Sequence, residues 1–311
     1  MPATPGRAGH ERGSLLGRLA AWWEGVEAAA PLEAPVLADP EEAVPVERRE
    51  IDLRKWSAER LEAAQLLYGR GWLSPGGEAL YSELLKCLLL DASQTVVQHG
   101  AALGGLARMI SRQTDAWVEA QEEEPLFAAE ATRQIKAAGM SKKVTVLDAP
   151  VQGGAVKPRT RHAVVSSEAL YRVKNKKAEL ASLRAMLKPG GQLVLTDFVR
   201  KGAGAEAIGR WARCEASEPH FATADELKGL LQAEKLDVRV FEDRSQDYCR
   251  AALSDLQAFL RSMETSPVRQ PLRGYLIWEI EVLTQKLQAI DSGAIGFQRI
   301  FALAPTQATA R

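Results

Sequence analysis

A glycine-rich turn is the segment of the sequence best suited to hold a ligand. Residues 95–97 form a short β-branched run (TVV), residues 100–105 read GAALGG, and helix-forming residues follow from 106 to about 112. Glycine carries no side chain and adopts left-handed backbone angles, so such a turn lets the backbone approach a ligand closely. The order of strand, glycine turn and helix is compatible with a dinucleotide-binding fold, although a lone glycine pattern is weakly specific.

The histidines and cysteines predict no metal site. His99 stands beside the glycine turn, where an imidazole can act as a base, although a histidine at a strand end more often packs against its neighbours. His162 and His220 have no potential ligands at metal-like spacing. The three cysteines are widely spaced and form no CxxC pair, so neither a zinc cluster nor a disulfide framework is expected.

Apolar runs alternate with helical stretches along most of the chain. After the run at 95–97, further runs occur at 117–118, 144–147, 163–165, 193–195, 238–241 and 297–303. Helices are predicted at 56–68, after the turn at 74–77 to about 89, and at 276–290. This alternation predicts an α/β fold with a doubly wound, mainly parallel sheet covered by helices on both faces. The last run is expected to be an antiparallel strand.

The first 50 residues differ in character from the rest. Residues 14–30 have apolar side chains at helical spacing and predict an amphipathic helix, and residues 31–50 are rich in proline and acids and predict a linker. The folded domain is expected at 51–305, followed by a tail at 306–311. The helix is expected to pack on its own domain or on a protein partner, such as a second copy of the chain. Contact with a membrane surface is the alternative, disfavoured by the few basic residues.

Composition narrows the class of protein. The chain has 311 residues, of which 46% are hydrophobic and 26% charged, so it can bury a sizeable core. Its formal net charge is zero, which argues against a dedicated nucleic-acid binder. No apolar run approaches the ~20 residues of a transmembrane helix, and the polar residues 1–13 do not predict a secretory signal. A cytoplasmic location is therefore expected.

Two further segments resemble a known family. Residues 187–199 (LKPGGQLVLTDFV) look like the end of a crossover helix and the fifth strand of class I S-adenosylmethionine-dependent methyltransferases, and residues 166–173 (SSEALYRV) look like the loop after the fourth strand. The similarity extends from about 56 to 305 and is to the small-molecule group that includes phosphoethanolamine and ubiquinone-pathway enzymes. It implies a Rossmann-like sheet of seven strands.

The resemblance implies S-adenosylmethionine as the cofactor. In the family, the first strand ends in an acid and continues into a G-x-G-x-G turn that receives the methionine part of the cofactor. Gly100 and Gly104 keep the outer glycines, whereas Ala102 replaces the middle one and Gln98 replaces the acid. Gln98 can still accept a hydrogen bond but lacks the charge that would hold an ammonium group, and the methyl group of Ala102 is unfavourable if its backbone is left-handed.

The remaining cofactor contacts are also implied by the resemblance. Glu122, 24 residues after Gln98, matches the acid that holds both ribose hydroxyls, with Glu119 as a rival in a shifted register. A carboxylate suits this task because its two oxygens accept two hydrogen bonds at once. Asp148 resembles the acid that faces the adenine amino group, and Ser167 is expected to contact the cofactor.

The acceptor residues implied by the resemblance follow the fourth and sixth strands. Glu168, Tyr171 and Tyr248 are expected to bind the acceptor, and His99 and Tyr248 are the candidate catalytic residues. Methyl transfer needs chiefly in-line positioning, with a base only when the acceptor must lose a proton. The cations between 142 and 177 form either solvated faces or a surface for an anionic acceptor.

Two functions remain open on the sequence. The first is a methyltransferase for a small-molecule or lipid-related acceptor. The second is a pseudoenzyme that keeps the fold and acts as an interaction or regulatory subunit. The residues that separate them are Gln98 and Ala102, because both depart from the family's cofactor motif.

Overall fold

The computed structural model of the protein describes residues 52–148, 156–202 and 204–306. The predicted N-terminal helix and linker, and residues 307–311 of the predicted tail, lie outside the described residues. The strands are β1 (Thr95–His99), β2 (Trp117–Gln121), β3 (Val144–Leu147), β4 (Arg161–Ser167), β5 (Leu187–Arg200), β6 (Asp237–Asp243) and β7 (Ile295–Leu303).

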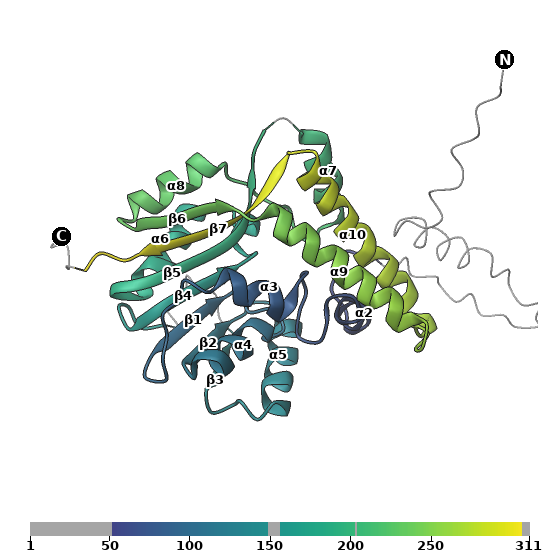
Figure 1. Cartoon of the computed structure of the whole chain (residues 1–311), viewed down its shortest axis with the longest axis horizontal. Helices are drawn as coiled ribbons and strands as arrows, with labels where there is room; N and C mark the ends of the chain where they lie inside the picture. Colours follow the sequence, from purple (N-terminus) through teal and green to yellow (C-terminus); the bar gives the residue numbers. More distant parts are fainter. Residues whose placement is uncertain (1–51, 149–155, 203, 307–311) are drawn as a thin grey trace, which may run out of the picture. The chain divides into compact units, whose positions relative to one another are not determined.

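These strands form one sheet in the order β3-β2-β1-β4-β5-β7-β6 (Figure 1). Neighbouring strands are parallel from β3 to β5, and β7 runs antiparallel to both β5 and β6. The predicted seven-stranded, mainly parallel sheet and its antiparallel last strand are confirmed. Because β1 lies between β2 and β4, the residues that follow these three strands meet at one edge of the sheet.

Helices pack on both faces of the sheet (Figure 1). The helices are α2 (Ala58–Tyr68), α3 (Gly77–Leu84), α4 (Gly105–Thr114), α5 (Pro125–Ala137), α6 (Lys176–Met186), α7 (Ala205–Cys214), α8 (Ala224–Ala233), α9 (Ser245–Met263) and α10 (Arg273–Asp291), with 3-10 turns η2 (Leu170–Arg172) and η3 (Gln270–Leu272). Within the described part of the chain, none of them combines the length and apolar character that a membrane span requires.

The alternation of side chains along each strand supplies both cores. Val96 packs in a core with residues of α3 and α4, whereas its neighbour Val97 packs in a second core with residues of α6 and α8. Successive residues of a strand face opposite sides of the sheet, so a sheet covered on both faces needs strands that are apolar throughout. This explains why the strands appear in the sequence as continuous apolar runs.

Helix α3 is shorter than predicted. It ends at Leu84 instead of continuing to about residue 89. Leu89 is 77% exposed, and its backbone N–H and C=O are both hydrogen-bonded to the side-chain amide of Gln192 on β5. The leucine-rich sequence would suit a longer helix, but the chain must turn back toward the start of β1, and Gln192 supplies the backbone partners that a helix would otherwise provide.

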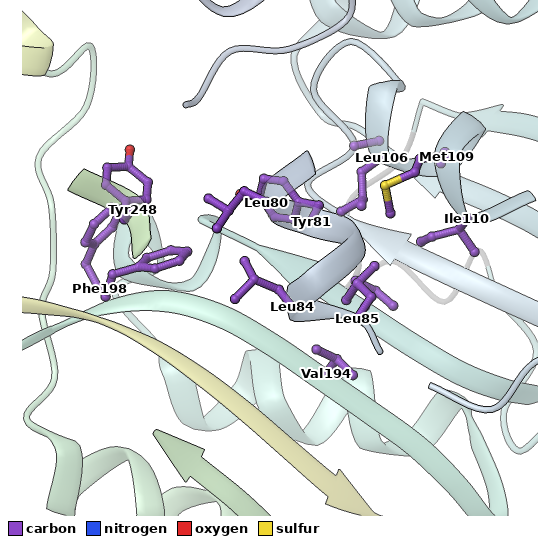
Figure 2. Close-up of a cluster of buried hydrophobic side chains, with 14 of the residues drawn as sticks. Leu80, Tyr81, Leu84, Leu85, Leu106, Met109, Ile110, Val194, Phe198 and Tyr248 are labelled. Atoms are coloured by element: carbon purple, nitrogen blue, oxygen red, sulfur yellow. The ribbon is translucent and has the colours of Figure 1, made fainter. Parts of the chain in front are cut away.

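Helix α3 carries one polar group into an otherwise apolar cluster. Figure 2 shows Leu80 and Leu84 of α3, and Leu85 directly after it, packed toward Leu106, Met109 and Ile110 of α4 and toward Val194 of β5. Tyr81 lies on the same face of the helix and is 1% exposed. The apolar helix face thereby places a phenol hydroxyl beside the edge of the sheet where β1 and β4 end.

The KPGG segment at 188–191 lies at the start of β5. Helix α6 ends at Met186, so the segment follows the helix end directly, as its proline and glycines predict. Gly190 has a φ of +73° and its N–H donates to the carbonyl of Ala304, 3.2 Å away. The turn therefore also fastens β5 to the residue that follows β7.

Candidate cofactor and acceptor site

A cavity of about 410 Å³ lies at the edge of the sheet where β1, β2 and β4 end. Its volume is within the range typical of small-molecule sites. The walls come from the glycine turn, from the end of β2, from residues 167–173 after β4, and from the region around α2 and α3. Ligands of open parallel sheets bind at this carboxyl edge, so the location suits a cofactor.

The glycine turn adopts the backbone angles that its sequence predicts. Gly100 and Gly104 have φ values of +69° and +73°. A Cβ atom on Gly100 would come within 2.7 Å of the Ala169 Cβ, so the turn and the loop after β4 pack too closely for a side chain there. Ala102 has a φ of +47°, in the left-handed region, which costs a non-glycine residue roughly 1–2 kcal/mol.

Glu122 joins the end of β2 to the glycine turn. Its Oε2 accepts a 2.6 Å hydrogen bond from the Ala102 N–H, and its Oε1 accepts a 3.0 Å bond from the Glu124 N–H. Burial raises the pKa of Glu122, and the two backbone hydrogen bonds partly offset this rise. A carboxylate oxygen can accept more than one hydrogen bond, so both oxygens can also accept from vicinal hydroxyls.

The other acids proposed from the sequence lie elsewhere. Glu119 points to Arg161, with 2.5 Å between Oε2 and Nη2, and does not line the cavity. Asp148 follows β3 and is exposed, and it is not among the described residues that line the cavity. Of the two carboxylates considered for ribose binding, the structure therefore brings only Glu122 to the cavity.

Gln98 presents a buried acceptor with no partner. Its side chain is 2% exposed, and its Oε1 has no hydrogen-bond partner among the described residues. Its Nε2 lies 3.5 Å from the carbonyl oxygen of Gly100, a long contact. A buried acceptor without a partner costs free energy, and an ammonium group in the cavity would satisfy it. The residue is thus suited to a cationic ligand despite its lack of charge.

The described residues therefore fit the expected cofactor at two points. Gly100 lines the cavity without a side chain, so its backbone is open to the methionine part. Glu122 offers a buried carboxylate at the position expected for the ribose. Ser167 and Gln98 line the same cavity, together with the glycine turn.

A buried hydrogen-bond network joins α3 to the loop after β4. The Tyr81 hydroxyl donates to Glu168 Oε1 over 2.8 Å and accepts from the Ser167 hydroxyl over 2.8 Å, and Thr196 donates to Ser167 over 3.2 Å. Glu168 has a left-handed φ of +48°, and its N–H donates to the Thr196 carbonyl. Tyr81 and Glu168 both line the cavity.

Behind Glu168 lies a buried lysine. Lys286 of α10 is 7% exposed, and its Nζ lies 3.7 Å from Glu168 Oε2. The Tyr248 hydroxyl is 3.5 Å from the same oxygen and 3.4 Å from Nζ. The ammonium group also lies over the rings of Phe198 and Trp211. Lys286 thus balances the charge of Glu168 at Oε2, whereas Tyr81 donates to Oε1.

Two predicted acceptor residues lie behind the wall of the cavity. Tyr248 is fully buried in the network just described, and Tyr171 is fully buried against Phe198, Trp211 and Phe221. Neither lines the cavity. Their predicted contact with the acceptor would require the wall to open, whereas Glu168 lines the cavity as described.

His99 is buried with both ring nitrogens engaged. Nδ1 lies 2.8 Å from the Ser166 hydroxyl, and Nε2 lies 3.0 Å from Glu179 Oε1 on α6. A base in catalysis needs a free nitrogen toward the acceptor. The geometry therefore fits a residue that holds α6 against the end of β1, the packing alternative considered from the sequence.

The charges around the cavity are mostly negative. Four carboxylates contribute to its lining, those of Glu122, Glu123, Glu168 and Glu179. Arg172 contributes the single lysine or arginine among the described lining residues. Among the described residues, no group of three histidine, cysteine or acidic side chains is arranged to hold a metal ion.

Sequence reasoning did not single out Tyr81, Glu179 or Trp72 as site residues. Tyr81 lies on the apolar face of a helix, where a tyrosine predicts packing, and Glu179 lies in a helix rich in charges. Trp72 stacks on Tyr81 with 5.3 Å between ring centroids and also lines the cavity. No local pattern around these three residues marks them as site residues, because only the tertiary structure brings them to the cavity.

Comparison with known proteins gives one family and a set of structural neighbours. The family model of the methyltransferase domain matches residues 72–239. No curated protein sequence matches the chain.

Phosphoethanolamine N-methyltransferase 2 from Haemonchus contortus, solved with phosphomonomethylethanolamine and S-adenosylhomocysteine, has a TM-score of 0.71 and 17% identity. The alignment covers 82% of this chain and 61% of that one, so this chain spans about three fifths of that neighbour's length.

Two further neighbours have lower scores. A putative sarcosine dimethylglycine methyltransferase from Galdieria sulphuraria has a TM-score of 0.62 and 16% identity, covering 75% of this chain and 86% of that one. Geranyl diphosphate C-methyltransferase from Streptomyces coelicolor A3(2) has a TM-score of 0.58 and 13% identity, covering 79% and 98%. At identities this low, the structural similarity establishes the shared fold alone.

Proposed function

The chain belongs to the methyltransferase-domain family, whose methyl donor is S-adenosylmethionine, and we propose that it methylates a small-molecule acceptor in the cavity at the ends of β1, β2 and β4. The observation that carries this proposal is the bond between Glu122 and the Ala102 N–H. It holds a buried carboxylate and the glycine turn together in one wall of the cavity. A ligand that carries both a ribose and an amino-acid tail can therefore contact both.

The residues of this wall have separate tasks in the proposal. Glu122 holds the ribose hydroxyls, the backbone around Gly100 receives the methionine part, and the Gln98 oxygen accepts from the ammonium group. When bound, S-adenosylmethionine supplies an electrophilic methyl group on its sulfonium. The neutral Gln98 contributes less binding free energy than an acid would. An ammonium group binds a carboxylate more strongly than an amide oxygen, because both partners are then charged.

The acceptor is proposed to bind against Tyr81 and Glu168. Tyr81 lies on α3 and Glu168 directly follows β4, and both line the cavity. Trp72 adds an aromatic surface beside Tyr81. Burial, reinforced by the charge of Glu168, raises the pKa of the Tyr81 hydroxyl well above its usual value. Tyr81 is therefore a neutral phenol, and the network holds its oxygen in position to orient a polar group of the acceptor.

Titration calorimetry with S-adenosylmethionine and S-adenosylhomocysteine tests the proposal. We expect micromolar binding by the wild-type protein. The matched variant is Gln98→Asp with Ala102→Gly, which restores the family motif and should bind more tightly. Absence of binding up to millimolar ligand, from a protein shown to be folded by circular dichroism, would contradict the proposal and favour the pseudoenzyme alternative.

A further inference from the structure

Arg172 lies on the loop that packs against the glycine turn. The loop contact is made by Ala169, whose Cβ would be 2.7 Å from a Cβ on Gly100. Arg172 follows three residues later, at the end of the turn η2, and lines the same cavity as Gly100. A ligand group that reaches the glycine turn therefore comes close to the loop that carries this guanidinium.

The Arg172 guanidinium contacts Glu215 and the Tyr171 ring and remains accessible to solvent. Its Nη2 lies 3.5 Å from Oε2 of Glu215, and its Cζ lies 4.9 Å from the centroid of the Tyr171 ring. The side chain of Arg172 is 45% exposed, whereas that of Glu215 is 9% exposed. A guanidinium has five N–H donors, so one long contact leaves donors for a ligand.

Glu215 is a suitable anchor because it is itself fixed. Its Oε1 accepts a 2.8 Å hydrogen bond from the Trp211 indole N–H. Burial acts to raise the pKa of Glu215, but the charges of Arg172 and Lys286 outweigh it, and the pKa is lowered overall. A buried, ionised carboxylate thus restricts the guanidinium to one side of the loop.

The charges of the cavity match those of the methyl donor. S-adenosylmethionine carries two positive groups, the sulfonium and the ammonium, and one negative group, the α-carboxylate. The described lining contributes four carboxylates and one guanidinium, and Gln98 is neutral where the family has an acid. Arg172 is the one lysine or arginine among the described lining residues, so its guanidinium is the group suited to pair with the α-carboxylate.

We propose that Arg172 binds the α-carboxylate of the methyl donor. This inference rests on the proposed function. It adds a charged hydrogen bond to the α-carboxylate to the neutral hydrogen bond that Gln98 is proposed to accept from the ammonium group. An anionic group on the acceptor is the other possible source of a negative charge at this place, and the experiment separates the two.

The experiment measures binding of two ligands to three proteins by calorimetry. S-adenosylhomocysteine carries the amino-acid end, and 5′-methylthioadenosine has the same nucleoside and thioether without it. We expect Arg172→Gln to weaken S-adenosylhomocysteine binding by about 10- to 100-fold, as loss of a charged hydrogen bond implies, and to change 5′-methylthioadenosine binding less than about twofold. Lys174→Gln removes an exposed cation outside the cavity and should match the wild type for both ligands.

Three results would overturn the inference. Unchanged binding of S-adenosylhomocysteine to Arg172→Gln would show that the α-carboxylate does not bind this residue. Arg172 would then be assigned to an anionic group of the acceptor. Equal weakening of both ligands would show that the substitution distorts the cavity. Failure of the wild-type protein to bind either ligand would overturn the proposed function itself. Wild-type binding together with equal weakening of both ligands in Arg172→Gln would overturn only the role assigned to Arg172.

Discussion

The backbone N–H of Ala102 donates a 2.6 Å hydrogen bond to the carboxylate of Glu122. This bond connects the middle of the glycine turn to the end of β2, two segments that also pair through the Ala101 N–H and the Gln121 carbonyl. The proposed ribose carboxylate therefore also supports the turn that is proposed to receive the methionine part. Binding and local stability depend on the same side chain.

Glu122→Ala should weaken both properties. It leaves the N–H groups of Ala102 and Glu124 without their partner, so we expect a loss of about 1–3 kcal/mol in the free energy of unfolding. Binding of S-adenosylhomocysteine should weaken by about tenfold or more. Urea unfolding and calorimetry measure the two effects. Glu119→Ala is the matched control and should leave binding unchanged, whereas weaker binding in this control alone would favour the shifted register.

Ala102→Gly should stabilise the protein. The residue has a φ of +47°, which glycine adopts freely and alanine does not. The gain is reduced by the greater freedom of glycine in the unfolded chain, so we expect about 0.5–1 kcal/mol in urea unfolding. A lower free energy of unfolding would indicate that the alanine methyl group makes packing contacts that outweigh the backbone strain.

Asp197 should make the stability depend on pH. Burial raises its pKa to about 7, although its oxygens accept hydrogen bonds from the backbone N–H groups of Phe198 and Tyr171. Below pH about 4, the side chain is protonated in the folded and unfolded states alike. As the pH rises to about 7, the unfolded chain loses this proton first, so the group's contribution to stability is lost, by up to about 4 kcal/mol.

Asp197→Asn isolates this contribution. The variant has no titration at this position, so the free energy of unfolding of the wild type minus that of the variant should fall as the pH rises from 4 to 7 and level off above. Urea unfolding at several pH values measures the difference. Parallel pH profiles for the two proteins would contradict the assignment of the raised pKa to Asp197.

Tyr81→Phe should separate the network from cofactor binding. It removes the 2.8 Å hydrogen bond to Glu168, and a hydrogen bond to a charged group contributes about 1.5–3 kcal/mol. We expect a loss of that size in urea unfolding, with S-adenosylhomocysteine binding within about twofold of the wild type. Tyr275→Phe, at a half-buried tyrosine of α10, is the control. A large loss of cofactor affinity in Tyr81→Phe would place Tyr81 on the donor instead of the acceptor.

Local patterns in the sequence predicted the order of strands and helices. The strands at 95–99 and 144–147 appear as apolar runs because both faces of the sheet are covered. The glycines at 100 and 104 predicted their left-handed angles, since few other residues adopt them. These features depend on residues close in the sequence, and the chain encodes them directly.

Contacts across the sheet were decided by tertiary structure alone. Both Glu119 and Glu122 suited the ribose by sequence, but they differ by three positions on a strand and its end, and only Glu122 reaches the cavity. Tyr81 and Glu168 are 87 residues apart, and the hydrogen bond between them requires α3 and β4 to pack at one edge.

The same holds for His99. As a residue beside a glycine turn it was a candidate base, and Glu179 on α6 engages its second nitrogen. The period of a strand or helix specifies which face a side chain occupies, but not which distant residue lies opposite. The sequence by itself therefore determined the fold, the glycine turn and the identity of the candidate groups. The packing of α3 and α6 against the sheet decided which of those groups line the cavity and which partners they contact there.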